Sequence, residues 1–373
     1  MRVDFFRHNI GQAEIDAAVD VLKSIFITTG RVVEDFEHQF SSYLGGGHSV
    51  GVNSCTAALH LALVALNIGP EHEVITTPLT FVSSVSPILY VGAKPVFVDV
   101  EPTTGNLDVS KVEAAITKRT AAIMPVHLHG HMADVVALRQ IADRHGLPIV
   151  EDSAHCIEGV RDDIRPGGLS DAACFSFYAT KNITSAEGGV LFTKNEELAA
   201  NVRRLRLHGM SASANDRYTK GYRHYDVDML GYKYNMANVN AALLLGQLQR
   251  IESLLERREA LAQRYNRGFR DNPRITVQEV LPHTRSARHL YAIRVDPRNR
   301  DRTLVELQQR GIGVSVHFNP VHLMTYYRRS HGYSEGDFPV AESIGQSTVS
   351  LPLYPSLTDD ETDYVIQAVN EVV

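Results

Sequence analysis

Residues 133–151 read ADVVALRQIADRHGLPIVE, and a helix and a strand follow each other within them. Apolar residues recur at helical spacing from residue 133 to 142, and Gly146 and Pro148 are helix stop signals. Residues 147–151 form a short apolar run with the length and β-branched content of a strand buried on both faces. The stretch therefore predicts an amphipathic helix followed at once by a buried strand.

The same alternation continues on both sides of this stretch. Short apolar runs lie at residues 49–53, 73–77, 95–99, 121–125, 173–177 and 189–193, and a second helical pattern covers residues 56–65. Alternating strands and helices predict βαβ units, and so an α/β fold with a mainly parallel central sheet flanked by helices. A further helix is expected in front of this region, from Gly11 to Ile25.

The pattern changes after residue 236. Residues 236–271 contain no proline and predict one long helix or two nearly continuous ones. Beyond them we expect strands at 289–295 and 313–316, and helices at 302–310 and 358–373. We therefore divide the chain into a large domain, residues 1–248, and a smaller C-terminal α+β domain, residues 249–373.

Composition excludes several classes of protein. The 373 residues carry a formal net charge of -6, which is unlike the basic surface of a non-specific nucleic-acid binder. There is no apolar run of 18 residues, and the charged N-terminus does not resemble a signal peptide. Three scattered cysteines, Cys55, Cys156 and Cys174, suit neither a disulfide framework nor a zinc site. A soluble cytoplasmic protein without nucleic-acid or membrane partners is expected.

Lys181 and Asp152 are the candidate catalytic residues. Lys181 lies just past the run at 173–177, where desolvation lowers the pKa of a lysine and makes the neutral amine available for Schiff-base chemistry. Asp152 directly follows the strand at 147–151, at the edge of the sheet where α/β proteins bind ligands. An aspartate there can pair with the protonated pyridine nitrogen of pyridoxal phosphate. A surface lysine and a helix-capping aspartate remain the simpler interpretations of each residue alone.

A phosphate site is also available beside these residues. Ser54, Cys55 and Thr56 join a strand to a helix, where free backbone N–H groups and the helix dipole favour an anion. Ser54 or Thr56 is equally well explained as an N-cap. Ser176 can add a hydroxyl, and Phe81 can either stack on a planar ring or belong to the core.

The chain resembles the DegT-type nucleotide-sugar aminotransferases, a family of fold-type I pyridoxal phosphate enzymes. The similarity runs nearly end to end. It rests on Thr28–Gly30, NSCTAALH at 53–60, TPLTF at 77–81, Pro125–His127, EDSAH at 151–155, FSFYATKNITSAEGG at 175–189, GYKYN at 231–235, Pro320–His322 and LPLYP at 351–355.

The resemblance implies a cofactor, pyridoxal 5'-phosphate, and a role for each matching residue. It makes Lys181 the Schiff-base lysine and Asp152 the partner of the pyridine nitrogen. The other implied cofactor contacts are Ser54, Cys55, Thr56, Phe81, His155, Ser176 and Asn235. Asn235 matches a residue given by the neighbouring subunit, so a homodimer with shared active sites is implied.

The implied reaction moves an amino group from glutamate to a nucleotide-linked ketosugar, with pyridoxamine phosphate as the intermediate form of the cofactor. The implied sugar contacts are Phe26, Thr29, His317 and His322. Ser185-Ala186 precedes Glu-Gly-Gly here, as in similar enzymes that aminate a UDP-4-ketopentose for lipid A, a part of lipopolysaccharide. This detail favours C4 of a UDP-4-ketosugar. Cations for the substrate pyrophosphate could come from Arg31, Lys233 or Arg223.

Three alternatives stay open. A dehydratase or epimerase would use the same cofactor, and a regulatory protein would keep the fold without turnover. The alternating His127, His129 and His131 would share one face of a strand and make a metal site conceivable. No carboxylate at matching spacing completes such a set, so we expect no metal and assign these histidines to polar lining or surface.

Overall fold

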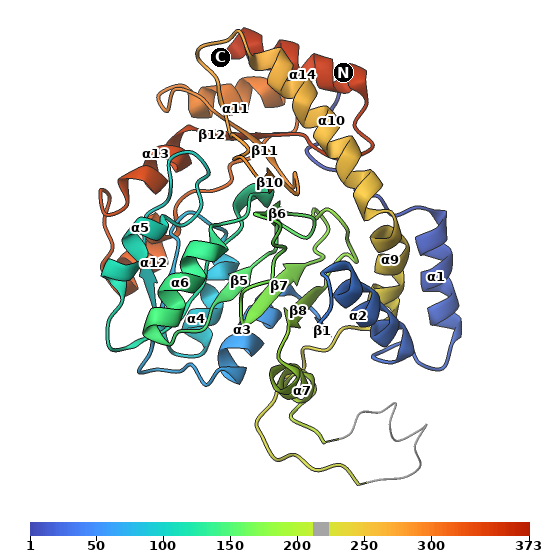
Figure 1. The fold of residues 1–373 in the computed structure, drawn as a ribbon. Coiled ribbons are helices and arrows are strands. Elements are labelled where there is room, and N and C mark those ends of the chain that lie inside the picture. The colour runs from blue at the N-terminus through green and yellow to red at the C-terminus, as the bar shows by residue number, and fades with distance from the viewer. Residues whose placement is uncertain (212–223) are drawn as a thin grey trace.

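Two sets of strands join into one layer across the larger part of the molecule (Figure 1). The computed structural model describes residues 1–211 and 224–373. A three-stranded sheet has the order β3-β2-β4 and a four-stranded sheet the order β1-β8-β7-β5. Parallel bridges Ile123–Ile149 and Val126–Asp152 connect β4 to β5. The strands are β1 (His48–Val52), β2 (Glu73–Thr76), β3 (Lys94–Phe97), β4 (Thr120–Ile123), β5 (Val150–Asp152), β7 (Ala172–Ser176) and β8 (Gly189–Thr193).

Strand direction determines where functional residues gather. β2 pairs parallel with β3 and β4, and β5 pairs parallel with β7, whereas β8 runs antiparallel to both β1 and β7. The predicted mainly parallel sheet is confirmed. Ser176 and Val52 both stand opposite Gly189, so the carboxyl ends of β1 and β7 meet the amino end of β8 at one edge.

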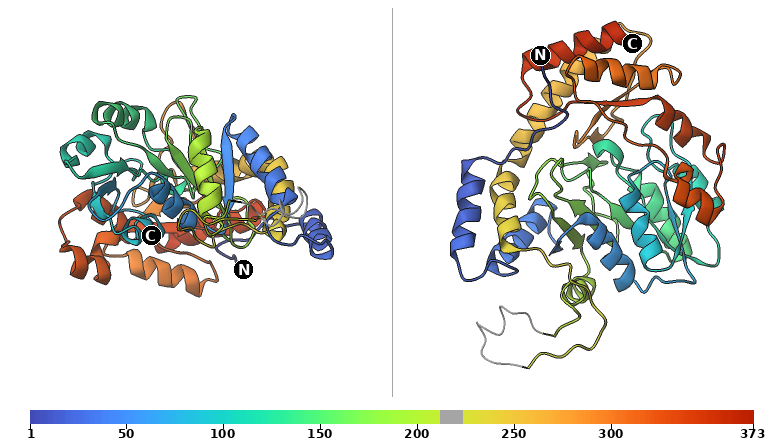
Figure 2. Two further views of the ribbon diagram at one scale, coloured as in Figure 1. Left: turned by 90° about the horizontal axis from the view of Figure 1, so that it is seen from below. Right: turned by 180° about the vertical axis from the view of Figure 1, so that it is seen from behind.

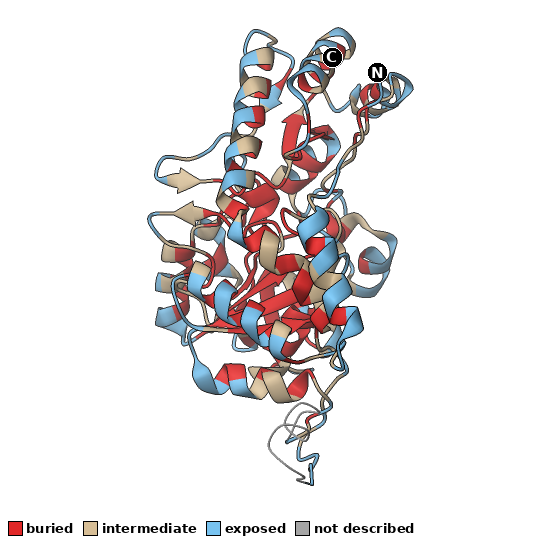
Figure 3. Ribbon diagram, turned by 90° about the vertical axis from the view of Figure 1, so that its right-hand side faces the viewer, coloured by how far each residue is buried: buried red, intermediate tan, exposed pale blue. Residues whose placement is uncertain are grey.

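Helices cover both faces of this layer. α3 (Cys55–Ala65) contacts β5, β7 and β8, while α2 (Arg31–Tyr43) packs on the other face, where its phenylalanines meet Phe175 and Phe177 edge to face. Consecutive residues of β7 alternate between these layers, with Cys174 in the α3 core and Phe175 in the α2 core. Because both faces are buried, the strands read as continuous apolar runs. Figure 3 shows this buried layer between helices with exposed outer faces.

Two nearly continuous helices lead out of the large part. α9 (Asn238–Gln249) and α10 (Ile251–Phe269) are separated at Arg250, whose backbone leaves the helical region. Of the two alternatives for residues 236–271, the pair of helices is therefore the correct one. α1 (Gln12–Lys23) lies along α9, as the right-hand view of Figure 2 shows, and α10 continues toward both termini. The predicted domain boundary at residue 248 lies beside this break and stays a prediction.

The C-terminal part has its own apolar core. It contains β9 (Thr276–Val277), β11 (Tyr291–Arg294), β12 (Thr348–Leu351), α11 (Arg300–Gln309) and α14 (Asp359–Val372). Val3 joins this core and pairs with Ile312, which brings the N-terminus to it. The expected strand at 313–316 is wrong: within the described chain the segment makes only a bridge from Ser315 to Ser350 and a backbone hydrogen bond from Gly313 to Val3, and it continues as a loop.

The shorter elements complete the described chain. They are α4 (Ser86–Tyr90), α5 (Val109–Val112), α6 (Val135–His145), α7 (Glu196–Leu205), α12 (Thr325–His331), α13 (Pro339–Ser347), β6 (Val160–Arg161) and β10 (Thr284–Arg285). No helix within residues 1–211 and 224–373 has both the length and the apolar character needed to cross a membrane.

Candidate active site

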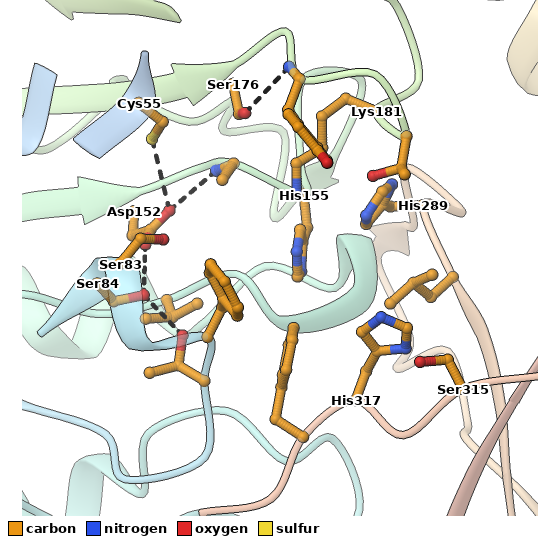
Figure 4. A pocket seen from close by; sticks show the side chains of 18 of the residues that line it. Cys55, Ser83, Ser84, Asp152, His155, Ser176, Lys181, His289, Ser315 and His317 are labelled. Atoms are coloured by element: carbon orange, nitrogen blue, oxygen red, sulfur yellow. Dashed lines mark hydrogen bonds between the residues drawn. The ribbon is translucent and has the colours of Figure 1, made fainter. Parts of the chain in front are cut away.

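A cavity of about 620 Å³ opens where the strand ends meet. Asp152 is the last residue of β5, and Ser176 is the last residue of β7. Lys181 lies in the turn after β7, and all three side chains line the cavity (Figure 4). The sheet edge thus brings together the three residues that the sequence predicted to act on one cofactor, as expected for ligand sites in α/β folds.

The Asp152 carboxylate is fixed by donors on both of its oxygens. The Ser84 hydroxyl donates to Oδ2 at 2.6 Å, and the backbone N–H of Ala154 donates to Oδ1 at 3.0 Å. Its backbone N–H donates to the Pro125 carbonyl, which ties the residue to the segment after β4. Asp152 is therefore an oriented negative charge in the cavity wall, available to a cationic ligand atom.

Lys181 interacts electrostatically with the Asp152 carboxylate. Its backbone N–H donates to the Tyr178 carbonyl at 2.9 Å, which forms the turn after β7. Desolvation lowers the pKa of Lys181 to about 8, although the Asp152 carboxylate and Cys55 act in the opposite direction. A substantial fraction of neutral amine is therefore present near pH 8, as a nucleophilic lysine needs.

The start of α3 forms the anion-binding end of the cavity. The Ser54 hydroxyl caps the helix by accepting from the Ala57 N–H at 3.1 Å. The N–H groups of Cys55 and Thr56 lie in the first turn, where no intrahelical acceptor exists. Gly189, the first residue of β8, packs directly against the start of α3. A side chain could not fit there, because a Cβ would lie 2.4 Å from the Ser54 carbonyl carbon. Ser54 can therefore cap the helix while the neighbouring N–H groups bind an anion, so the two interpretations of this residue are compatible.

Flat rings form the remaining walls. Phe81 is 54% exposed, so it is a wall residue and does not belong to the core. Its ring lies 6.0 Å from that of Phe318, which in turn stacks on His155 at 5.8 Å. A cavity with an amine, a carboxylate, an anion-binding helix start and aromatic walls fits pyridoxal phosphate.

His155 and His317 are neutral cavity residues. Burial lowers the pKa of His155 well below its ordinary value, and burial lowers that of His317 to about 3. The His317 ring stacks on Phe5 at 5.5 Å, and its Nδ1 lies 2.9 Å from the Ser350 hydroxyl. The N-terminal segment therefore supplies part of the cavity mouth.

Four of the selected residues lie together outside this cavity, namely Phe26, Thr29, Lys233 and Asn235. Asn235 Nδ2 donates to the Thr29 hydroxyl at 2.6 Å, and Lys233 Nζ donates to Asn235 Oδ1 at 2.6 Å. The Phe26 carbonyl accepts from Asn238 Nδ2 at 2.8 Å. The four residues are at least partly exposed and do not line the chain's own cavity. Residues that contribute to a partner's site would have to lie in this way.

His322 does not reach the cavity. Its side chain is fully buried, and its Nε2 lies 2.9 Å from Glu342 Oε1. Nothing in this position allows contact with a ligand in the cavity described above. The resemblance placed His322 in a segment that lines the sugar pocket of similar proteins, but here the chain turns inward at Pro320 and residues 321–323 form a short 3-10 helix.

The alternating histidines are buried, so of the two roles predicted for them, polar lining or surface, the surface role is wrong. Residues 128–130 form a 3-10 turn instead of a strand, so the three rings do not share a face. His127 Nε2 lies 2.6 Å from Glu151, while His129 bonds to Gln278 and to the His317 carbonyl. Among the described residues no group of three histidine, cysteine or acidic side chains is arranged to hold a metal.

The three candidate cations remain unassigned. Arg31 lies 3.9 Å from Asp35, and Lys233 is bonded to Asn235. Arg223 lies outside the described residues. Sequence analysis also missed several cavity residues, namely Phe5, Phe6, Ser84, Tyr178, His289 and Phe318. His289 begins the predicted strand at 289–295 and was detectable there, whereas nothing in the local sequence marks Phe5 or Ser84.

Comparison with known proteins identifies the family. The sequence model of the DegT/DnrJ/EryC1/StrS aminotransferase family matches residues 8–370. The chain belongs to this family. It is a pyridoxal phosphate-dependent sugar aminotransferase of fold type I, which explains why an amine, a carboxylate and an anion-binding helix start share one cavity.

Individual relatives of the aminotransferase match over nearly their whole length. SpsC of Bacillus subtilis, a spore coat polysaccharide biosynthesis protein, is 45% identical over 370 residues, which cover 98% of this chain and 95% of SpsC. Spr1654 of Streptococcus pneumoniae, in its PMP form, has a TM-score of 0.94 at 34% identity, covering 100% of this chain and 99% of Spr1654. DesI, solved with its TDP-sugar product, has a TM-score of 0.89 at 28% identity, covering 99% and 92%.

Proposed function

We propose that this enzyme transfers the amino group of glutamate to the carbonyl carbon of a nucleotide-linked ketosugar, at C4 of a UDP-4-ketosugar. One observation carries the catalytic part: Lys181, with its pKa lowered to about 8, faces the same cavity as the fixed carboxylate of Asp152. The nucleotide part is supported by DesI, which was solved with a TDP-sugar. Ser185-Ala186 favours the lipid A type of substrate and a product for lipopolysaccharide.

Pyridoxal phosphate, when bound, supplies a carbonyl that accepts amino groups and a ring that stabilises negative charge on the adjoining carbon. We assign its pyridine nitrogen to Asp152, whose carboxylate stabilises the protonated form. Its phosphate is assigned to the α3 start, with the N–H groups of Cys55 and Thr56, the Ser54 region and the Ser176 hydroxyl. Phe81 and His155 are assigned to the two faces of its ring.

Lys181 has the role of proton carrier. Its Nζ, neutral for part of the time because of desolvation, would move a proton from the reacting carbon of glutamate to the cofactor carbon that receives the amino group, and in the second half-reaction from that cofactor carbon to the sugar carbon. The Asp152 carboxylate nearby stabilises the protonated amine during each transfer. The partly apolar cavity strengthens this interaction because water screens it less there than in bulk solvent.

We propose that the functional unit is a homodimer with shared active sites. The outer face of α1 and the segment after it expose apolar residues, among them Leu22 at 60% and Ile25 at 89%, which is typical of an interface. Asn235 and Thr29 would then serve the partner's cofactor and sugar. Mixing inactive Lys181→Ala and Asn235→Ala subunits should restore activity, because each mixed dimer has one intact site. No recovery in mixed dimers would contradict the sharing.

The decisive experiment follows the nitrogen atom. The purified enzyme is incubated with ¹⁵N-glutamate and a panel of nucleotide ketosugars, and the products are analysed by mass spectrometry. A ¹⁵N-labelled amino sugar, strongest with a UDP-4-ketosugar, supports the proposal. An unlabelled product that has lost a hydroxyl or inverted a carbon would indicate a dehydratase or epimerase. Bound cofactor that never reacts with glutamate would indicate a non-catalytic protein.

A further inference from the structure

A buried hydrogen-bond chain ends at the cavity wall beside Lys181. Asn182 Nδ2 lies 2.9 Å from each carboxylate oxygen of Glu158 and 2.7 Å from the Ala287 carbonyl. Asn182 Oδ1 lies 3.3 Å from Nδ1 of His289, whose ring lines the cavity. Glu158 is fully buried, and neither it nor Asn182 touches the cavity itself.

The chain fixes the tautomer of His289. Glu158 and the Ala287 carbonyl are acceptors, so the amide nitrogen of Asn182 must face them and its oxygen must face His289. An oxygen can only accept, so His289 carries its hydrogen on Nδ1. Burial and the positive charge of Lys181 keep the pKa of His289 well below its ordinary value, so the ring is neutral. Its Nε2 is therefore an unprotonated acceptor, without a partner in the described chain.

The neighbouring His155 has the opposite tautomer. Its Nδ1 accepts the backbone N–H of His129 at 3.3 Å, so a neutral His155 carries its hydrogen on Nε2. The two rings lie 4.4 Å apart, side by side in Figure 4. One imidazole thus offers a donor and the next an acceptor. His155 faces the space assigned to the cofactor, which leaves the His289 acceptor to the substrate.

We propose that His289 Nε2 accepts a hydrogen bond from the sugar hydroxyl next to the reacting carbonyl, and that Asn182 and Glu158 are positioning residues that hold it in this state. The inference rests on the proposed function and identifies one determinant of substrate choice. A neutral acceptor suits a hydroxyl and disfavours the carboxylates of glutamate, whose oxygens would face a lone pair. His289 therefore acts in only one half of the reaction.

The two half-reactions separate this role from general damage. Single-turnover absorbance changes of the bound cofactor measure glutamate and ketosugar reactivity independently. His289→Phe should lower the rate constant with ketosugar about 10- to 100-fold and leave that with glutamate within about 3-fold. His60→Phe is the matched control, since His60 is a buried histidine outside the cavity. Equal losses in both half-reactions, or none with ketosugar, would overturn the proposal.

A substrate pair tests the hydroxyl itself. The ketosugar half-reaction is compared for nucleotide 4-ketosugars with and without the hydroxyl at C3. The native enzyme should discriminate between them about 10-fold or more, and His289→Phe should not. Undiminished discrimination by the variant would assign the contact to another residue. Failure of the proposed function would look different, because the native enzyme would then convert neither sugar.

The tautomer can be observed directly. In protein labelled with ¹⁵N-histidine, the NMR signals of His289, assigned from their loss in His289→Phe, should show Nδ1 protonated and Nε2 unprotonated. Asn182→Ala should shift both signals toward a mixture of tautomers and lower the ketosugar rate about 5-fold. Glu158→Gln keeps an acceptor for Asn182 and should retain the native signals. A native His289 protonated on Nε2 would overturn the proposal.

Discussion

The floor and the rim of the cavity are built in different ways. The floor, meaning Lys181, Asp152 and the start of α3, consists of residues at or just beyond the ends of buried strands. The rim, meaning Phe5 and His317, is assembled from the N-terminus and from a loop of the C-terminal part. More than 300 positions of sequence separate the two rim residues, and the pairing of Val3 with Ile312 helps to bring them together.

This difference indicates that the floor carries out the chemistry and the rim selects the substrate. Floor residues are fixed by the sheet, and in the proposed reaction their chemistry, an amine beside a carboxylate, serves both substrates. Rim residues lie outside the sheet, and stacked rings there suit recognition of one substrate more than bond breaking. Variants of the floor should therefore impair both half-reactions, whereas variants of the rim should impair one. The predictions below test this contrast.

The largest effect is expected from Lys181→Ala. Without Nζ no side chain of the floor can carry the proton, so both half-reactions should slow by at least about 10³-fold. Lys181→Arg is the matched control: it keeps the positive charge but is never a neutral amine, so it should be equally slow. Stopped-flow absorbance of the bound cofactor measures both. Turnover within 10-fold of the native enzyme would remove Lys181 from the floor's chemistry.

A somewhat smaller effect is expected from Asp152→Asn. The substitution keeps the shape and one oxygen but removes the charge, so both half-reactions should slow about 10²- to 10³-fold. Ser84→Ala keeps the charge and removes the donor to Oδ2, and its loss should stay below about 10-fold. An equal loss in the two variants would show that orientation of the carboxylate matters as much as its charge.

The floor was predictable because local sequence encodes it. Asp152 and Lys181 follow apolar runs that have the length and β-branched content of buried strands, and Ser54 to Thr56 join a strand to a helix. Ser84 was not predictable, since 68 positions separate it from the aspartate that it orients and no local pattern connects them. The rim was predicted in part: His317 was selected and lines the cavity, whereas nothing in the sequence marked Phe5. Near the rim, residues 313–316 form a loop instead of the expected strand, and His322 is buried beside Glu342.

The pKa of Lys181 gives a prediction of intermediate size. Only the neutral amine attacks the aldehyde of the cofactor, so covalent loading of the apoenzyme should accelerate as pH rises. With a pKa of about 8, the neutral fraction rises about 10-fold between pH 7 and pH 9 and then levels off. Absorbance after mixing with pyridoxal phosphate measures the rate. A rate still rising tenfold per pH unit above pH 9 would contradict a lowered pKa.

The smallest effect is expected at the rim, from Phe5→Leu. Leucine fills the apolar space but cannot stack on His317, and such stacking contributes about 0.5–1.5 kcal/mol, or about 2- to 10-fold. The loss should appear in KM for the ketosugar, while the glutamate half-reaction keeps its rate because the floor is untouched. Phe5→Tyr retains the ring and should lose less than Phe5→Leu. If Phe5→Leu slowed both half-reactions equally, the N-terminal segment would be supporting the floor, and the distinction between floor and rim would fail at this point.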